Sequence, residues 1–385
     1  MKIFITILLM LNCLYTNAQE PIIIGLNADM SAVAKEGGVA IQRGAEIAIA
    51  EINERGGVLN RPLKLIIKNH RGNPARAINN LKALNEEEDL VAVIGGVHTP
   101  VALKELPLVH QNQIIYLGPW AAGTPIVDNG YKPNYVFRIS VRDEEAAKVM
   151  IPFAKKRGLN RVGLVLERTG WGRSNEVSMK AAALKNDIEI TQISWVNWGQ
   201  TNFKNEVKAL ESSDIQAIML VSNAPEGASF IKEMLKQKSR FPIISHWGIA
   251  SGNFVERVGL DALNKLDISI LQTYSFSKPH NEKLNSEVLK RYHQSYGVIP
   301  AISIPGAVGT AHSYDLVHLL AKAIVKAGTT DRPSIRNELE QLPTYSGLVK
   351  DYQPAFTKTQ HDGLLSHDYM MSTFDQVGNL IPLQD

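Results

Sequence analysis

Short apolar runs alternate with amphipathic stretches along the chain after its first twenty residues. The run 22–26 reads Ile-Ile-Ile-Gly-Leu, and residues 42–53 after it place alanine and isoleucine at helical spacing. Gly56 and Gly57 predict the end of this helix, because glycine adopts the left-handed turn of a helix C-terminus at little cost.

The same alternation continues to about residue 247. Asn73 followed by Pro74 is typical of an N-cap and the first turn of the next helix. The further runs that we interpret as strands are 63–67, 90–94, 114–117, 162–166, 188–195, 217–221 and 242–245. Nearly continuous apolar strands separated by helices are typical of parallel sheets that helices cover on both faces. The pattern therefore predicts an α/β protein.

This set of units runs twice, which predicts two lobes. The chain is expected to cross between the lobes at 135–139, at 266–273 and near Tyr345, and residues 303–328 predict a long helix of the first lobe. The expected division is 21–138 plus 270–343 for the N-terminal lobe and 139–269 plus 344–385 for the C-terminal lobe. Because ligands of open α/β sheets bind beyond the carboxyl ends of the strands, two facing lobes would enclose a shared cleft.

Residues 1–18 are typical of a secretion signal. Lys2 precedes the apolar stretch 3–11, and small residues at 16–18 offer a cleavage point; an uncleaved N-terminal anchor is the alternative. No later stretch has the roughly 18 apolar residues that a spanning helix needs. Cys13 is the only cysteine, so the cleaved chain would have none, which suits an oxidising compartment. We therefore expect a periplasmic protein.

Composition and motifs argue against several classes of function. The 385 residues carry a formal net charge of +3 without a dense basic run, which argues against nucleic acid as a partner. Phosphate-binding glycine loops, His-Glu-x-x-His and Gly-x-Ser-x-Gly are absent from the sequence, so we expect neither catalysis nor a cofactor. His361-Asp362 and His367-Asp368 are interpreted as surface loop residues rather than as a metal pair.

Two strand-end loops of the first half are candidate binding segments. His98-Thr99-Pro100 follows a strand, with Thr99 as the expected N-cap of the next helix; the hydroxyl would either help to bind an anion or only cap the helix. The next strand ends in Trp120-Ala121-Ala122-Gly123-Thr124, whose small residues let the backbone approach a ligand.

Tryptophans follow strands at three places, each next to a glycine or an alanine. They are Trp120, Trp171 and Trp247. Any one of them could be a core residue, but together they predict an aromatic wall around the cleft.

The chain resembles the type I periplasmic binding proteins of the leucine/isoleucine/valine-binding family, which serve ABC transporters. The resemblance covers nearly all of the chain after residue 20 and rests on the order and spacing of several motifs. These are 44–58 with 61–65, Pro74-Ala75-Arg76-Ala77, Val93-Ile94-Gly95-Gly96 and 379–383. It implies two doubly wound lobes with three crossovers that close around a small-molecule ligand by a hinge, and a monomer whose partner is a membrane permease.

The resemblance also implies binding roles. Thr99 would hold a ligand carboxylate, with Ala121 or Ala122 and Thr124 adding a backbone group and a second hydroxyl. Trp171 stands where the family often has tyrosine, and Asn223-Ala224 would add a contact from the second lobe.

One position departs from the family pattern. The carboxylate that receives the ligand ammonium in the branched-chain amino-acid binders falls near Ile249 here. An unpaired ammonium in a closed cleft is costly, so an apolar residue there disfavours an α-amino acid. Glu226 could substitute, or could begin a solvated helix.

We therefore expect a receptor that captures a small amino acid, carboxylate or amide for transport. A ligand-sensing module that signals to a membrane receptor or regulator is the alternative, because it would use the same fold. A periplasmic hydrolase is the weaker third reading, because no set of nucleophile, base and acid is visible.

Overall fold

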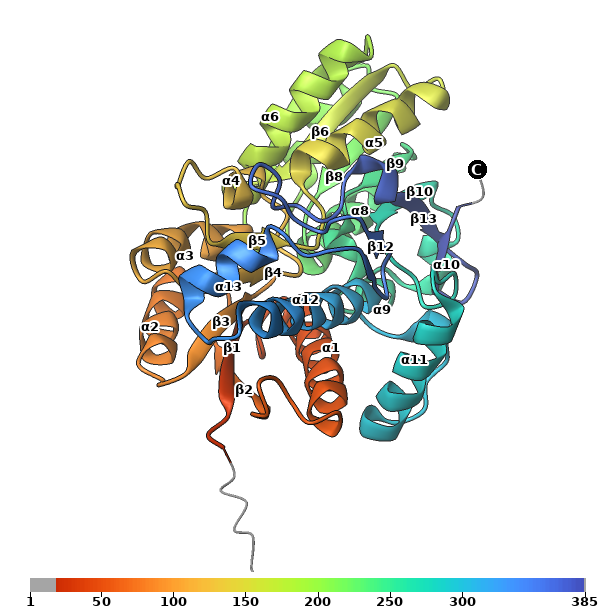
Figure 1. Cartoon of the computed structure of the whole chain (residues 1–385). Coiled ribbons are helices and arrows are strands. Elements are labelled where there is room, and N and C mark those ends of the chain that lie inside the picture. The colour runs from red at the N-terminus through yellow and green to blue at the C-terminus, as the bar shows by residue number, and fades with distance from the viewer. Residues whose placement is uncertain (1–18, 384–385) are drawn as a thin grey trace, which may run out of the picture.

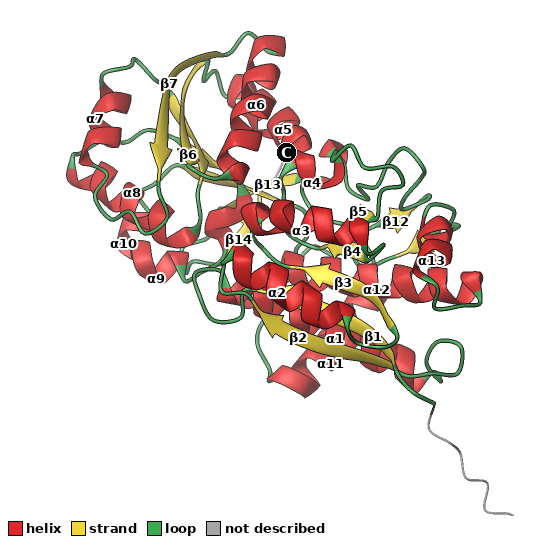
Figure 2. Cartoon of the chain, turned by 90° about the vertical axis from the view of Figure 1, so that its left-hand side faces the viewer, coloured by secondary structure: helices red, strands yellow, loops and turns green. Residues whose placement is uncertain are grey.

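Two separate sheets organise the structure, a computed structural model that describes residues 19–383 (Figure 1, Figure 2). The first sheet has five parallel strands in the order β2-β1-β3-β4-β5. Their bounds are β1 Ile22–Ala28, β2 Leu63–Asn69, β3 Leu90–Gly95, β4 Ile115–Gly118 and β5 Val136–Arg138. We call the part of the chain built on this sheet the first lobe.

Two long helices of the first lobe, α1 (Lys35–Glu54) and α12 (Ala307–Ala327), pack along each other. A Cβ atom at Gly44 would overlap the carbonyl oxygen of Thr310, so the close approach of the two backbones requires glycine there. Thr310 Oγ1 and Ser313 Oγ donate to carbonyl oxygens of α1 across this contact, at 3.1 and 2.8 Å. The other helices of this lobe are α2 Pro74–Asn85, α3 Thr99–Gln111, α4 Thr124–Val127, α11 Glu282–Tyr296 and α13 Arg332–Leu339.

The second sheet has seven strands in the order β14-β13-β10-β9-β8-β6-β7, and we call the part built on it the second lobe. Its strands are β6 Arg161–Glu167, β7 Glu189–Val196, β8 Ala217–Val221, β9 Ile243–Ser245, β10 Ile268–Gln272, β13 Met370–Phe374 and β14 Leu380–Pro382. Its helices are α5 Asp143–Lys156, α6 Gly170–Lys185, α7 Lys204–Glu211, α8 Ala224–Lys236, α9 Phe254–Val258 and α10 Leu260–Leu263. Short 3₁₀ turns η1 (Trp247–Ala250), η2 (Ala301–Ser303) and η3 (Ser366–Asp368) and the small sheet of β11 (Tyr345–Ser346) and β12 (Asp351–Tyr352) complete the chain.

The α/β class with parallel sheets is confirmed, with one addition. Strands β6 to β10 are parallel, whereas β13 and β14 add an antiparallel hairpin at the edge of the second sheet. Asn73 is the N-cap of α2 as predicted, because its side chain accepts from the Arg76 N–H at 3.0 Å.

A buried ion pair joins two of the connections between the lobes. Arg138 Nε lies 2.5 Å from Asp362 Oδ1, and Arg142 Nη1 lies 3.2 Å from Asp362 Oδ2. His361 stacks on Phe137 and contacts Glu340 at 2.9 Å. The expectation that His361 and Asp362 are surface loop residues is therefore wrong, because both are buried against the end of β5.

The chain leaves the second sheet after Gln272, the last residue of β10. The hairpin of β11 and β12 lies against α12, because Asp315 accepts hydrogen bonds from the Leu348 N–H and the Tyr352 hydroxyl. The residue limits predicted for the two lobes stay a prediction, and the expected signal segment 1–18 lies outside the described residues.

Candidate functional site

A small cavity lies between the two lobes, where β3, β6, β8 and β9 end. Its volume is about 20 Å³, room for about one water molecule. The residues that line it are Val97, His98, Thr99, Pro100, Trp120, Ala122, Glu167, Trp171, Trp198, Asn223, Trp247 and Gly248. Seven of the residues singled out from the sequence are therefore brought together: His98, Thr99, Trp120, Ala122, Trp171, Asn223 and Trp247.

On the first-lobe side, His98 and Thr99 begin helix α3. His98 is the N-cap residue and Thr99 the first helical residue, so the prediction that Thr99 is the N-cap is wrong by one position. The Thr99 hydroxyl accepts from the Gly123 N–H at 3.1 Å and so fixes the loop after β4 instead of capping its own helix.

The imidazole of His98 links the first lobe to the second. Its Nε2 lies 3.2 Å from Asp29 Oδ2, and its ring lies 5.2 Å from that of Trp198 in the second lobe. Burial acts to raise the pKa of Asp29, but hydrogen bonds from His98 and from the N–H groups of Ala34 and Ala32 outweigh it and hold this pKa well below its usual range. Asp29 is therefore an ionised partner that holds the imidazole in place.

A second aromatic pair bridges the lobes. Trp120 of the first lobe and Trp247 of the second have ring centroids 5.4 Å apart, with ring planes tilted by 37°. Trp247 is 2% exposed, and it is the first residue of η1, which follows β9 after His246. A ligand larger than a water molecule can enter the small cavity only if the residues that line it, these two rings among them, move apart.

The second-lobe side of the cavity contains a buried carboxyl group, Glu167, at the end of β6. Its Oε2 accepts from Trp198 Nε1 at 2.6 Å, and its Oε1 accepts from the N–H and Nδ2 of Asn223 at 2.8 and 2.7 Å. Burial raises the pKa of Glu167 to about 7, against the opposing effect of these donors. Glu226 lies nearby and adds to the increase.

Trp171 is the second residue of α6, where it also meets a carboxylate. Its Nε1 donates to Asp143 Oδ1 at 3.1 Å, and His246 Nε2 lies 3.2 Å from the same oxygen. Two tryptophans of the cavity, Trp171 and Trp198, thus direct their indole N–H groups to buried carboxylates.

Four predicted site residues do not line the small cavity. The carbonyl oxygen of Ala121 accepts a hydrogen bond from Arg138 Nη1, and Ala224 is buried as the first residue of α8. Thr124 bridges the lobes, since its N–H donates to Ser174 Oγ of α6 at 3.0 Å. Ile249 is buried in η1 and lines a neighbouring cavity instead.

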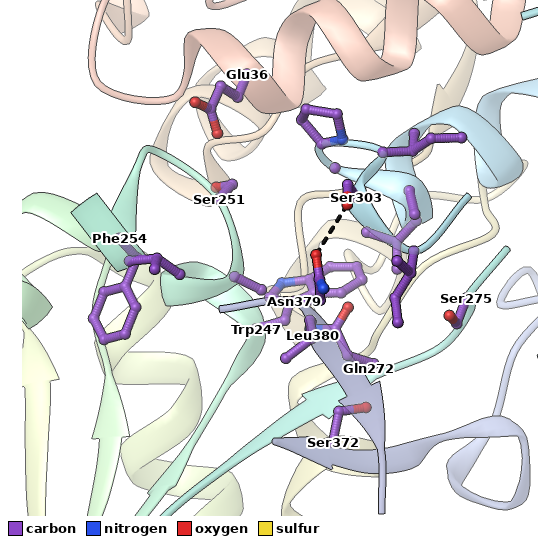
Figure 3. A pocket seen from close by; sticks show the side chains of 18 of the residues that line it. Glu36, Trp247, Ser251, Phe254, Gln272, Ser275, Ser303, Ser372, Asn379 and Leu380 are labelled. Atoms are coloured by element: carbon purple, nitrogen blue, oxygen red, sulfur yellow. Dashed lines mark hydrogen bonds between the residues drawn. The ribbon is translucent and has the colours of Figure 1, made fainter. Parts of the chain in front are cut away.

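That neighbouring cavity has a volume of about 320 Å³, and Trp120 and Trp247 line it as well as the small one. Figure 3 shows Trp247 among the side chains around it. Most of its polar groups are uncharged: Ser251, Asn253, Gln272, Ser275, Ser303, Ser372 and Asn379. Ser303 Oγ donates to Asn379 Oδ1 at 2.9 Å. Glu36 of α1 reaches across to the second lobe, where its Oε2 accepts from the Gly252 N–H at 2.6 Å.

Glu167, Trp198 and Glu36 line the two cavities but were not predicted from the sequence. Trp198 stands beside Gly199 shortly after β7, so it carried the signal that singled out Trp171. Glu226 was left open between a ligand contact and a solvated helix start. It is 3% exposed and accepts from the Gly199 N–H at 2.7 Å, so the solvated alternative is wrong.

Acidic side chains line both cavities. Their linings include Glu167, Glu36 and Glu256 but, within residues 19–383, no lysine or arginine. Over the same residues we find no group of three or more His, Cys, Asp or Glu side chains that could hold a metal ion. None of the helices in this range is long and apolar enough to cross a membrane.

Comparison with known proteins identifies what the chain is similar to. Residues 21–379 match the family described as periplasmic binding protein. The Leu/Ile/Val-binding protein homolog 1 of Brucella abortus is 21% identical over 336 residues, which cover 87% of this chain and 86% of that protein.

Solved structures share the fold. The branched-chain amino acid transporter substrate binding protein LivJ from Streptococcus pneumoniae, in complex with isoleucine, has a TM-score of 0.79 at 19% identity and covers 94% of this chain and 100% of its own. The solute binding protein of an ABC transporter from R. palustris, in complex with benzoate, has a TM-score of 0.79 at 18% identity and covers 94% and 95%.

Proposed function

This chain belongs to the periplasmic binding protein family, and we propose on that premise that it captures a small solute between its lobes and delivers it to the membrane permease of an ABC transporter. The observation that carries the proposal is that side chains from both lobes line each of the two adjoining cavities. Residues 1–18 act as the signal peptide that exports the chain, and the mature protein works as a monomer without converting its ligand.

The contacts between the lobes support capture by closure. Trp120 meets Trp247, and His98 meets Trp198, on opposite lobes. Hydrogen bonds of 3.0 Å from the Thr124 N–H to Ser174 and of 2.6 Å from the Gly252 N–H to Glu36 join the same faces. Because about 20 Å³ remains between the rings, a ligand enters when the lobes are apart and becomes buried as they close.

The groups at the small cavity suit a solute with both apolar and polar parts. The Thr99 hydroxyl, the start of α3 and the indole of Trp120 lie on one side, and the other three indoles and Asn223 lie on the other. The larger cavity, with its serine and amide side chains, extends the space available to the ligand. A solute of the size of an amino acid, small carboxylate or amide fits this arrangement.

Native mass spectrometry of the purified mature protein tests the proposal, followed by denaturation and identification of any released compound. We expect a one-to-one complex with a small molecule that raises the melting temperature when it is added back. A protein that binds no compound from a broad solute screen, and whose lobes never change separation in X-ray scattering, would contradict it.

Transport and sensing differ in what the loaded protein meets at the membrane. In proteoliposomes that contain the cognate permease and ATPase, a transport receptor stimulates ATP hydrolysis and uptake of the labelled solute. Binding without any stimulation would favour the sensing alternative.

A further inference from the structure

The small cavity combines four indole rings with a carboxyl group. Trp120, Trp171, Trp198 and Trp247 line it, and these are four of the five tryptophans in the chain. Glu167 is the carboxyl group, and it lies between Trp198 and Asn223. Faces of tryptophan attract organic cations, most strongly where water is excluded.

Electrostatics on the second-lobe side favour a positive ligand group. Behind the indoles lie the buried carboxylates of Asp143 and Glu226. Within the described part of the chain, Asp143 Oδ2 and Glu226 Oε2 have no hydrogen-bond partner, whereas Asp143 Oδ1 lies 3.2 Å from His246 Nε2. The first-lobe side adds no separate positive charge, because His98 is paired with the ionised Asp29. An anionic ligand would bring its charge close to Glu167 without a lysine or arginine to balance it.

Hydrogen-bond capacity distinguishes between kinds of cation. A primary ammonium has three N–H donors that each need an acceptor in a dry site. The oxygens of Glu167 already accept three of the about four hydrogen bonds that a carboxylate can accept, and the Thr99 hydroxyl accepts one of two, so these groups cannot serve three further donors. A quaternary, trimethylated ammonium has no such requirement, since it has no N–H and its charge is spread over methyl groups that indole faces contact directly.

The tryptophan N–H groups strengthen this preference. Trp171 donates to Asp143 and Trp198 donates to Glu167. A negative acceptor polarises the indole and makes its ring face more electron-rich. The two rings that meet the second-lobe carboxylates are therefore better partners for a cation than isolated indoles.

We propose that the small cavity, widened as the lobes separate, binds the quaternary, trimethylated ammonium head of a small organic cation among Trp120, Trp171, Trp198 and Trp247 and against Glu167. This inference rests on the proposed function and names the substrate class of the same cleft. The remainder of the ligand extends past Trp120 and Trp247 into the cavity lined by serine and amide side chains.

Titration calorimetry of the wild-type protein with matched compounds tests it without any variant. Choline is compared with its uncharged isostere 3,3-dimethylbutan-1-ol, and both with leucine and benzoate. We expect choline to bind at least about tenfold more tightly than the isostere, the difference expected of one charged contact in a dry site. Binding of leucine or benzoate without choline overturns the inference and leaves the proposed function standing. No binding by any of these four compounds also overturns the inference, whereas the proposed function falls only if the broad solute screen finds no ligand either.

Variants locate the contact. Glu167→Gln and Trp198→Leu should each weaken choline binding by about tenfold or more and leave the weak binding of the isostere nearly unchanged. The matched control for Glu167 is Glu105→Gln, because Glu105 is a buried carboxyl group that forms hydrogen bonds with Asn27 and Tyr116 away from the cavities. The matched control for Trp198 is Trp195→Leu, because the Trp195 ring, on β7, lies under the guanidinium of Arg173 and lines neither cavity. Equal losses in the controls and in the cavity variants would overturn the assignment.

Discussion

Neutralising Glu167 should flatten the pH dependence of stability. This side chain is 1% exposed, and burial raises its pKa from an ordinary 4.5 to about 7. The folded protein therefore holds this proton over a pH range in which the unfolded chain has already lost it. Stability consequently falls as the pH rises from about 4.5 to about 7, and the whole effect is about 3 kcal/mol at higher pH.

Urea unfolding of wild type and Glu167→Gln at about pH 5 and about pH 8 measures this difference. Glutamine cannot accept from both Trp198 and Asn223, so the variant should be about 1–3 kcal/mol less stable at the lower pH. Between the lower and the higher pH, the difference in unfolding free energy should move by about 3 kcal/mol in favour of the variant. The reason is that only wild type has to ionise the buried carboxyl group of Glu167 at the higher pH. Buried groups such as Asp315, whose pKa burial raises to about 6, occur in both proteins and cancel in the comparison.

Glu105→Gln provides the positive control for that measurement. Burial raises the pKa of Glu105 to about 7 as well, in the interior of the first lobe. Its replacement should change the pH slope in the same direction while leaving ligand binding unaffected. Parallel pH profiles for wild type and Glu167→Gln would refute the reasoning, since they would mean that Glu167 titrates alike in the folded and unfolded chains.

Three further substitutions test other parts of the site. Thr99→Ala should weaken binding of the ligand by about 1–3 kcal/mol if the hydroxyl contacts a charged group; calorimetry should show recovery in Thr99→Ser, and unchanged affinity would reduce Thr99 to its bond with Gly123. Asp362→Asn should destabilise the protein by about 3–5 kcal/mol in urea unfolding, because it leaves the buried Arg138 without its charged partner, whereas Arg142 keeps Glu144. Glu36→Ala removes the acceptor of the Gly252 N–H, so X-ray scattering of the unliganded protein should show a larger radius of gyration than wild type.

The sequence predicted the α/β class because the strands of a covered parallel sheet are apolar on both faces. The runs 90–94 and 217–221 became β3 and β8 within one residue. The hairpin of β13 and β14 was not predicted. Its strands are short, and β13 pairs with β10, which lies about 100 residues earlier in the chain. The burial of His361 and Asp362 likewise depends on partners far away in sequence, Phe137 and Arg138.

Strand ends also located much of the candidate site. Trp120, Trp171 and Trp247 could be singled out because glycine or alanine beside a tryptophan at a strand end leaves the ring little local packing. That reasoning could not show that Trp120 and Trp247 contact each other across the lobes, because the contact depends on how the two sheets face. Nor could it distinguish Glu167 from the many surface carboxylates, since its burial and its hydrogen bonds with Trp198 and Asn223 depend on how distant segments pack.

The apolar residue at Ile249 is evidence against a ligand ammonium only if no other carboxylate reaches the cleft. Ile249 lines the larger cavity, where Glu36 stands across from it on the first lobe, and Glu167 lines the smaller one. Negative groups are therefore retained around the cleft although the position itself is apolar. A cation placed beside the four indoles would gain from each ring and from Glu167, and it would lower the pKa of Glu167 by favouring its ionised form. Binding of such a ligand should thus release a proton near neutral pH, which calorimetry in buffers of different ionisation enthalpy measures, and Glu167→Gln should abolish that release.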